Sequence, residues 1–248
     1  MFKLLSMETN FSAIYQGRMD HVVHIQRTED LMDRVAATFR NRDYWIVENA
    51  QYAEPSFRLQ KCAAFINKMA GNRQCSLLDV GCGPAALRPL LSRNIDYCGI
   101  DIALHQSAPF LREVDTAQKP IAFDDRKFDF VMALGFFEYM GGKQDSKFLE
   151  IRKILKDDGK FILSYINFGH FRGKVWPNYN NVQSIAEMKR ALSKYYRVDS
   201  CFPASHHWRQ KQPGKRALRP LQMHVNFNIP VVSPMMAVEY FFICSPLR

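Results

Sequence analysis

Glycine and acidic residues follow a short apolar run in the first half of this chain. Asp79 lies at the end of the run 76–80, and Gly81 and Gly83 come directly after it. Two glycines at this spacing allow backbone torsions and a close ligand approach that side chains would block. A carboxylate at this place suits a cationic or amine-bearing ligand and repels a pyrophosphate. The pattern indicates a ligand-binding turn, and a turn that contains glycine for geometry alone is the alternative.

Two further acids follow later apolar runs. Asp101 lies twenty residues after Gly81, and an acid at that spacing can accept hydrogen bonds from both hydroxyl groups of a ribose. Asp115 follows the next run, where it can reach an adenine amino group. The alternatives are a strand-end cap for Asp101 and a solvated loop acid for Asp115. Together with Asp79, these acids predict a site for an adenosyl group next to a positive charge.

Such a site needs strands that end along one edge of a sheet. Alternation of short apolar runs with helical stretches predicts a parallel sheet covered by helices on both faces. We expect a turn at 157–159 between the helix over 145–156 and the strand over 160–166. We expect strands at 76–80, 96–101, 111–114, 128–133, 160–166, 196–203 and 237–244, and helices at 84–92, 145–156 and 183–194.

The N-terminal part has a different pattern. Residues 1–50 look irregular and partly helical, with an amphipathic helix that begins near Thr28. Apolar side chains at helical spacing also predict a helix over 56–69, which Gly71 ends. We therefore expect an N-terminal helical or lid segment over 1–70, followed by one α/β domain over 71–248.

Composition limits the class of protein. The chain has 248 residues, of which 47% are hydrophobic, so one large core is sufficient. Its apolar runs are too short for a membrane span, and its first residues lack the features of a signal peptide. The six cysteines form no CxxC pair. This usage predicts buried free thiols, no metal site and a cytoplasmic location.

Basic residues are unevenly distributed. The net charge is +10, and no Asp or Glu occurs between Ser200 and Val238. We expect residues 204–236 to form an insertion between the last two strands. A field of this sign attracts phosphate, carboxylate, nucleic acid or a membrane surface. A solvated loop whose charge only keeps the protein soluble is the equal alternative.

The order of these motifs identifies a family. Over about residues 76–167 the chain resembles the class I S-adenosylmethionine-dependent methyltransferases. The resemblance implies a Rossmann-like, seven-stranded, mostly parallel sheet whose last strand is antiparallel, and S-adenosyl-L-methionine as the cofactor. It is carried by LLDVGCGPAAL, YCGIDIA, EVDTAQKPIAFDDRKFDFVMALGFFEYM and LKDDGKFILSYIN.

The resemblance also implies a role for individual residues. Asp79, Gly81 and Gly83 would frame the methionine part of the cofactor, and Asp101 would bind the ribose. Asp115 with Thr116 would contact adenine. The segment after the fourth strand would line the sulfonium end, through Ala133, Leu134 and Gly135.

Two departures from the family pattern are visible. Ala85 replaces the third glycine, which we expect to be minor because alanine is small. Where many relatives carry a histidine after a glutamate, this chain has Glu138 and Tyr139. A histidine role at that place is therefore lost.

Catalytic candidates come from several places. Residues 166–177 show a short similarity to methionine-biosynthesis methyltransferase-like proteins, which makes His170 a candidate base and Arg172 a candidate for binding an anionic substrate group. His207, just past the sixth strand, and Glu138 are further candidate bases. Each has a structural alternative, namely a loop anchor for His170, a side chain turned away for His207 and a surface or core position for Glu138. Candidate substrate-binding aromatics are Tyr44, Tyr52 and Tyr139.

The leading hypothesis is therefore methyl transfer to a small molecule, with a general base and without a metal. Oxygen is favoured as the acceptor atom from family frequency, not from residues. The substrate could be anionic, and a homodimer stays open. The second hypothesis is an RNA methyltransferase or RNA-binding protein that uses the basic segment 204–236, although nucleic acid is less expected because aromatic residues do not alternate with the basic ones. A nicotinamide-dependent oxidoreductase is a third, which the missing GxGxxG disfavours.

Overall fold

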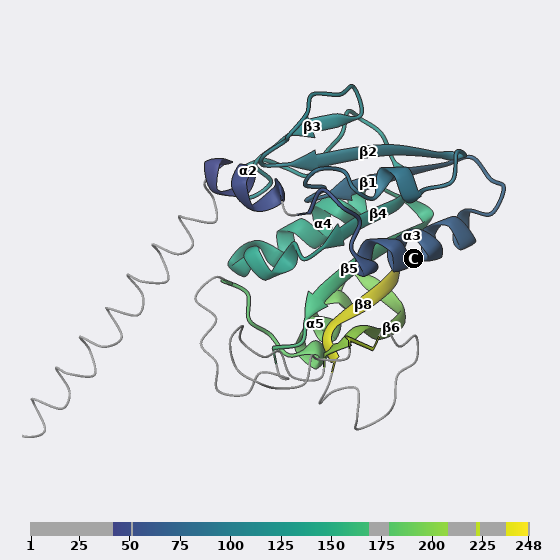
Figure 1. Ribbon diagram of the computed structural model, residues 1–248. Helices are drawn as coiled ribbons and strands as arrows, with labels where there is room; N and C mark the ends of the chain where they lie inside the picture. The colour runs from purple at the N-terminus through teal and green to yellow at the C-terminus, as the bar shows by residue number, and fades with distance from the viewer. Residues whose placement is uncertain (1–41, 51, 169–178, 208–221, 224–236, 248) are drawn as a thin grey trace, which may run out of the picture.

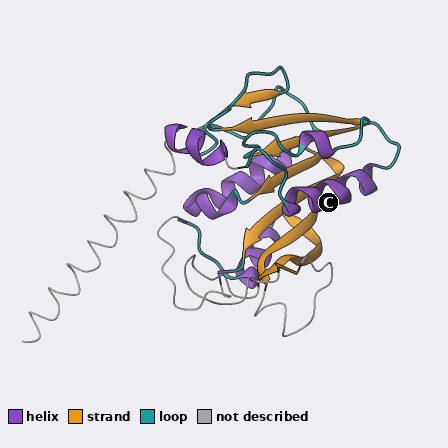
Figure 2. Ribbon diagram, viewed as in Figure 1, coloured by secondary structure: helices purple, strands orange, loops and turns teal. Residues whose placement is uncertain are grey.

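The computed structural model describes residues 42–50, 52–168, 179–207, 222–223 and 237–247, with the side chains of 205–207 and 222–223 left out. These residues form one twisted sheet with helices around it (Figure 2). None of the helices in these ranges is both long and apolar enough to cross a membrane.

The sheet has the predicted topology. Strands β3, β2, β1, β4 and β5 lie side by side and run parallel. β8 then lies between β5 and β6 and is antiparallel to both, which confirms the antiparallel last strand. A two-residue strand, β7, adds to the edge beyond β6. The bounds are β1 (Cys75–Val80), β2 (Ile95–Asp101), β3 (Leu111–Glu113), β4 (Phe128–Leu134), β5 (Leu155–Ile166), β6 (Tyr196–His207), β7 (Gln222–Met223) and β8 (Ala237–Pro246).

Neighbouring residues of the central strands face opposite sides of the sheet. Leu77 and Phe130 pack on one side, where α3 (Phe57–Ala70) covers them with Cys62 and Ile66. Leu78 faces the other side, where α4 (Gln144–Ile154) and α5 (Ile185–Leu192) provide the cover. Because apolar residues fill both faces, the strands appear in the sequence as continuous apolar runs.

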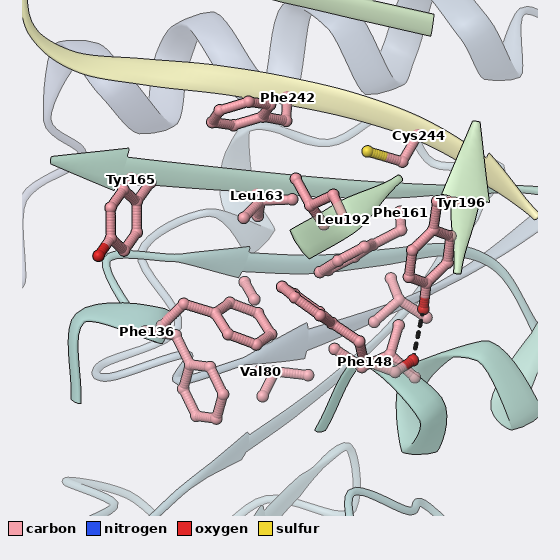
Figure 3. Packing of buried hydrophobic residues seen from close by; sticks show 14 of the residues in the cluster. Val80, Phe136, Phe148, Phe161, Leu163, Tyr165, Leu192, Tyr196, Phe242 and Cys244 are labelled. Carbon is pink, nitrogen blue, oxygen red and sulfur yellow. Dashed lines mark hydrogen bonds between the residues drawn. The ribbon is translucent and has the colours of Figure 1, made fainter. Parts of the chain in front are cut away.

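Aromatic rings fill the face covered by α4 and α5. Phe148 of α4 packs against Phe161 of β5 and Tyr196 of β6 (Figure 3). The hydroxyl of Tyr196 donates a hydrogen bond of 2.7 Å to the carbonyl oxygen of Phe148. The polar end of this buried ring is thus satisfied, and the cluster holds β5 and β6 at a fixed distance from α4.

Capping residues set the ends of two helices. The side chain of Ser56 accepts from the Leu59 amide at the start of α3, and Gly71 follows its end, as expected. At the start of α5, Ser184 and Glu187 form a reciprocal capping box. The expected segment 1–70 includes α3. In the structure, Cys62 and Ile66 of α3 are fully buried against the sheet.

One predicted helix is absent. The sequence pattern predicts an α-helix over 84–92, and the structure has only turns and a short 3-10 helix, η1 (Arg88–Leu90). Ala85 adopts a left-handed φ of 58°, a conformation that does not continue a right-handed helix. Pro84 and Pro89 also remove two backbone donors. The prediction of a helix here was wrong.

The expected turn at 157–159 is also different. β5 begins at Leu155, which lies opposite Phe128, and its register shifts before Lys160 pairs with Phe130. The extra residues bulge from a strand that continues, so no separate turn divides helix from strand. The predicted helix near Thr28 and most of the 204–236 insertion lie outside the described residues.

Candidate functional site

A cavity of about 400 Å³ opens at the carboxyl ends of β1, β2, β4 and β5. Loops after these strands line it, together with α3 and a helix near the N-terminus, α2 (Arg42–Ala50). Figure 1 shows α2 beside the ends of β2 and β3. Ligands of open α/β sheets bind at this edge. We call the lining near Asp79 and Asp101, at the tips of β1 and β2, its first end. The lining near Ile166 of β5 and Glu239 of β8 is its second end.

Asp79 lies in the first end, at the tip of β1, and is buried. Tyr97 of β2 donates its hydroxyl to Asp79 Oδ2 at 2.9 Å. Burial raises the pKa of Asp79 to about 7, and the nearby charge of Asp101 adds to the rise, while the hydrogen bond from Tyr97 opposes it. A carboxylate in this state gains from a cationic ligand, which would restore its ionised form.

The glycine turn connects β1 to the carboxylate of Asp101. Gly81 and Gly83 have left-handed φ values of 76° and 52°, which glycine adopts without steric cost. Asp101 Oδ2 accepts the Gly83 amide at 2.8 Å, and Oδ1 accepts the Ala103 amide at 3.0 Å. The turn is therefore closed onto the end of β2, as a binding cradle requires.

Asn49 of α2 reaches the same carboxylate. Its Nδ2 lies 3.4 Å from Asp101 Oδ1 and 3.4 Å from the Ala103 carbonyl oxygen. Asn49 is buried, although it belongs to a helix with exposed residues such as Val47. An ion pair between Arg42 and Glu113 of β3 holds the start of α2 over the same edge. α2 thus forms a wall of the cavity through Trp45 and Asn49.

The remaining cofactor candidates also line the cavity. They are Asp115, Thr116, Leu134 and Gly135. Asp115 is half-buried and its Oδ1 accepts the Ala117 amide at 2.9 Å, so part of its capacity serves the local turn. Gly135 donates its amide to Ser164 Oγ at 3.0 Å. Of the nine cofactor candidates of the sequence analysis, eight line this one cavity, whereas Ala133 is buried in the core and does not line it.

Glu138 occupies the second end of the cavity and is fully buried in the short 3-10 helix η2 (Phe137–Tyr139). Its Oε1 accepts the Ile166 amide at 2.9 Å. Its Oε2 is buried and has no hydrogen-bond partner among the residues that the structure describes. Burial raises the pKa of Glu138 to about 8, and the charge of Glu239 adds to the rise. Buried polar atoms without a partner are rare and costly, so this oxygen is a candidate to meet a ligand.

An ion pair lies beside Glu138. Arg58 of α3 donates through Nη1 to Glu239 Oε1 of β8 at 2.9 Å. The same Nη1 would lie 3.1 Å from a Cβ at Gly135. The guanidinium therefore packs against the bare backbone at the end of β4, between the two ends of the cavity.

Aromatic rings complete the second end. Tyr139 makes edge contacts with Trp45 of α2 and tilted contacts with Tyr179, in both cases with ring centroids 5.3 Å apart. Tyr52 also lines the cavity and is 46% exposed, so it lies at the mouth. Tyr44 is not among the lining residues and packs against Trp45 instead. Of the proposed substrate-binding residues, Tyr52 and Tyr139 are thus in place, and Tyr44 is not.

Sequence reasoning missed several residues of this site. Tyr97 and Asn49 contact the two buried acids, and Arg58 and Glu239 form the ion pair. A charged residue within the apolar strand 237–246 was the one available signal, because Glu239 interrupts that run. His170 and Arg172 lie outside the described residues, and His207 is described in β6 only as backbone, so their roles stay predictions.

These residues fit the cofactor that the sequence implies. The site offers two buried carboxylates at adjacent strand tips, a cradle of left-handed glycines and a volume in the range of small-molecule pockets, about 300–1,000 Å³. Asp101 suits ribose hydroxyl groups, and Asp79 suits an amino group or other positive charge.

Comparisons with known proteins agree with the fold. A family model described as a methyltransferase domain matches residues 53–218. A comparison with curated proteins gives no match.

Three solved structures illustrate the likeness. A putative methyltransferase from Haloferax volcanii, solved in complex with the Trm112 methyltransferase activator, is 17% identical with a TM-score of 0.55, over 83% of this chain and 96% of that one. A SAM-dependent methyltransferase from Aquifex aeolicus is 14% identical with a TM-score of 0.52, over 82% and 98%. Another from Clostridium acetobutylicum is 10% identical with a TM-score of 0.54, over 76% and 91%. At these identities the structures show the fold alone.

Proposed function

Because the chain belongs to the methyltransferase-domain family and is a class I S-adenosylmethionine-dependent methyltransferase, we propose that it methylates a small molecule in the cavity described above. We further propose that Glu138 accepts the proton which the methylated atom loses. Both proposals concern the molecule that receives the methyl group, because membership of the family does not identify that molecule.

The observation that carries the proposal is the buried, unpartnered Oε2 of Glu138 in the same cavity as Asp79 and Asp101. A general base must face the substrate and titrate near the working pH. Glu138 lines the cavity, and its pKa is raised to about 8 by burial.

Bound S-adenosylmethionine supplies an electrophilic methyl group on a sulfonium, which needs no further activation by the protein. The chain's task is then to bind and orient. Asp101 would accept hydrogen bonds from ribose hydroxyl groups, and Asp79 would face the positive charge of the methionine part. Glu138, at the other end, would take the acceptor's proton through Oε2 while Ile166 holds Oε1 in place. Orientation of this kind accounts for much of the rate enhancement of a displacement reaction.

A carboxyl base serves an O–H or an N–H acceptor. Oxygen is the expectation from family frequency. His170 and His207 stay alternative bases, and Arg172 stays the candidate that would bind an anionic substrate. A homodimer and a cytoplasmic location are likewise proposals that rest on the sequence.

The test has two arms. The purified protein is first titrated with S-adenosylhomocysteine by calorimetry, and binding is expected. It is then incubated with labelled S-adenosylmethionine and either a metabolite extract or total RNA from the host. Label in a small molecule supports the proposal, and Glu138→Gln should reduce that labelling by about 10²–10⁴-fold. Unchanged labelling by the variant would remove Glu138 from the mechanism.

An RNA substrate is the second candidate. It rests on the acid-free run from Ser200 to Val238, and most of that run lies outside the described residues. Labelling of RNA alone, with an affinity that falls steeply as salt rises, would promote this candidate over the first.

A further inference from the structure

Negative charge dominates the cavity, although the whole chain is basic. Six of its described lining residues are acidic and one, Arg58, is basic. Asp79, Asp101 and Asp115 belong to the proposed cofactor end. The other end keeps Glu138 and Glu239, with the exposed Glu54 at its mouth. That end is the place where the acceptor of the proposed reaction would bind.

The guanidinium of Arg58 is the cation near Glu138 and Glu239 among the described lining residues. Arg58 Nη1 lies 2.9 Å from Glu239, whose side chain is 13% exposed. Glu138 Oε1 accepts a hydrogen bond from the Ile166 amide, but Oε2 accepts none from any described residue. Arg58 is paired with Glu239, whereas burial and the charge of Glu239 favour the protonated form of Glu138 in the empty cavity, so a bound cation would stabilise the ionised form of Glu138. An N–H donor with a positive charge would satisfy the free oxygen and stabilise the carboxylate that forms when Glu138 loses its proton.

Aromatic rings stand next to this carboxylate. Tyr139 directly follows Glu138 in the chain, and its ring contacts those of Trp45 and Tyr179. All three side chains line the cavity. The faces of tyrosine and tryptophan rings attract cations, and the attraction strengthens where water is excluded. A flat apolar body would also pack against such rings.

We infer that the acceptor is a primary or secondary amine on a small aromatic or flat apolar body, bound as its ammonium ion between Glu138 Oε2 and the rings of Trp45, Tyr139 and Tyr179. The inference rests on the proposed function and names its substrate class. It departs from the oxygen acceptor expected from family frequency, because a neutral hydroxyl would satisfy Oε2 but bring no charge. An anionic acceptor would meet Glu138 and Glu239 at close range.

The chemistry balances with the groups present. The ammonium gives one proton to Glu138 Oε2 and becomes a neutral amine with a free lone pair. That lone pair forms the new N–C bond to the methyl group as the C–S bond breaks, and the C–S electron pair stays on sulfur. The product is a methylated ammonium ion and a neutral thioether, and the proton on Glu138 leaves to solvent.

If the acceptor is an ammonium ion, its binding should release a proton from Glu138. Glu138 faces Arg58 from α3, Glu239 from β8, Tyr165 from β5, and the neighbouring Tyr139 and Tyr179. With its pKa raised to about 8 in the empty cavity, Glu138 holds a proton at pH 7. Binding of an ammonium ion should release that proton, whereas binding of a neutral alcohol should not.

The test uses three probes of nearly the same shape, benzylamine, benzyl alcohol and benzoate. Each is titrated by calorimetry into the protein saturated with S-adenosylhomocysteine, in two buffers with different heats of ionisation. Benzylamine should bind about tenfold more tightly than the alcohol, and benzoate most weakly. Only benzylamine should show a heat that depends on the buffer. Glu138→Gln should remove both effects, and Asp157→Asn, at a 90% exposed side chain that does not line the cavity, should leave them.

Equal affinity for the amine and the alcohol, tighter binding of benzoate, or no binding of any probe would overturn the inference. So would a preference for the amine that persists in Glu138→Gln. These results are distinct from failure of the proposed function, which would show as no binding of S-adenosylhomocysteine or as labelling of RNA alone. A labelled hydroxyl compound from the metabolite extract would uphold the proposed function and overturn the amine.

Discussion

Asp101 joins three parts of the molecule through one carboxylate. It accepts the amides of Gly83 and Ala103 and lies within reach of Asn49. Burial raises its pKa, and these hydrogen bonds oppose the rise. Its oxygens still have capacity for ligand hydroxyl groups, since a carboxylate offers about four acceptor sites.

Asp101→Ala should weaken the binding of S-adenosylhomocysteine by about 1–3 kcal/mol, because hydrogen bonds to a charged group are lost. Calorimetric titration measures the change. Asp96→Ala is the matched control, since Asp96 is the second residue of the same strand and forms an exposed ion pair with Arg126. If both variants bound the nucleoside as tightly as the unmodified protein, Asp101 would not be a ribose ligand.

At the scale of elements, the turn at the end of β4 links the two ends of the cavity. Gly135 has a left-handed φ of 64°, and a Cβ there would lie 3.1 Å from Arg58 Nη1. Gly135→Ala would therefore combine backbone strain with displacement of the guanidinium. We expect a loss of about 1–3 kcal/mol in the free energy of unfolding, measured by chemical denaturation.

Gly142→Ala is the control for this turn, because a Cβ at Gly142 meets nothing within 4 Å and its φ is not left-handed. Its free energy of unfolding should change little or rise. A loss at Gly142 as large as that at Gly135 would count against the packing of Arg58 on the turn.

The loop after the glycine turn stores strain at Ala85, whose φ is 58°. Ala85→Gly should raise the free energy of unfolding by about 0.5–1 kcal/mol, because relief of the left-handed strain exceeds the added chain entropy. The adjacent Ala86→Gly, at a residue without positive φ, should lower it by a similar amount. Thermal unfolding of the pair decides, and a loss in both variants would show that Ala85 is not strained.

The elements that the sequence predicts well are those built by local pattern. β4 was expected at 128–133 and covers Phe128–Leu134, because all its residues except Asp129 are apolar, as is typical of a strand covered on both faces. The absence of an α-helix at 84–92 could not be predicted in the same way. Its apolar spacing is real, but the left-handed Ala85 and the short path from β1 to β2 are properties of the packed chain.

Some residues of the candidate site are likewise marked by a local sequence pattern, and others are brought together only by the fold. Asp79 and Asp101 could be found because strand tips and glycines mark them in the sequence. The ion pair of Arg58 with Glu239 joins residues 181 positions apart, and no local pattern carries that information. Glu138 was a candidate base by position, yet its unpartnered oxygen became visible only through its burial.

At the scale of the whole molecule, two buried acids couple folding to pH. Asp79 and Glu138 have pKa values near 7 and 8 when folded, against ordinary values of 3.8 and 4.5. Between these limits the folded state binds more protons than the unfolded state. Stability is therefore greatest below about pH 4 to 5 for these two groups, and falls as pH rises through 7 to 8. Asp199, whose pKa is lowered to about 2 by Lys160, Ser245 and Arg197, acts only at more acidic pH.

Glu138→Gln should therefore stabilise the ligand-free protein in a pH-dependent way. The amide keeps an oxygen for the Ile166 amide and removes a buried charge. We expect a gain on the order of 4–5 kcal/mol in the free energy of unfolding at pH 9 and of about 1 kcal/mol or less at pH 5. Urea unfolding at both values measures it, with Asp157→Asn, at a 90% exposed side chain, as the control for losing one carboxylate. A gain that is equal at the two pH values would mean that Glu138 keeps an ordinary pKa, and the argument for a general base would lose its support.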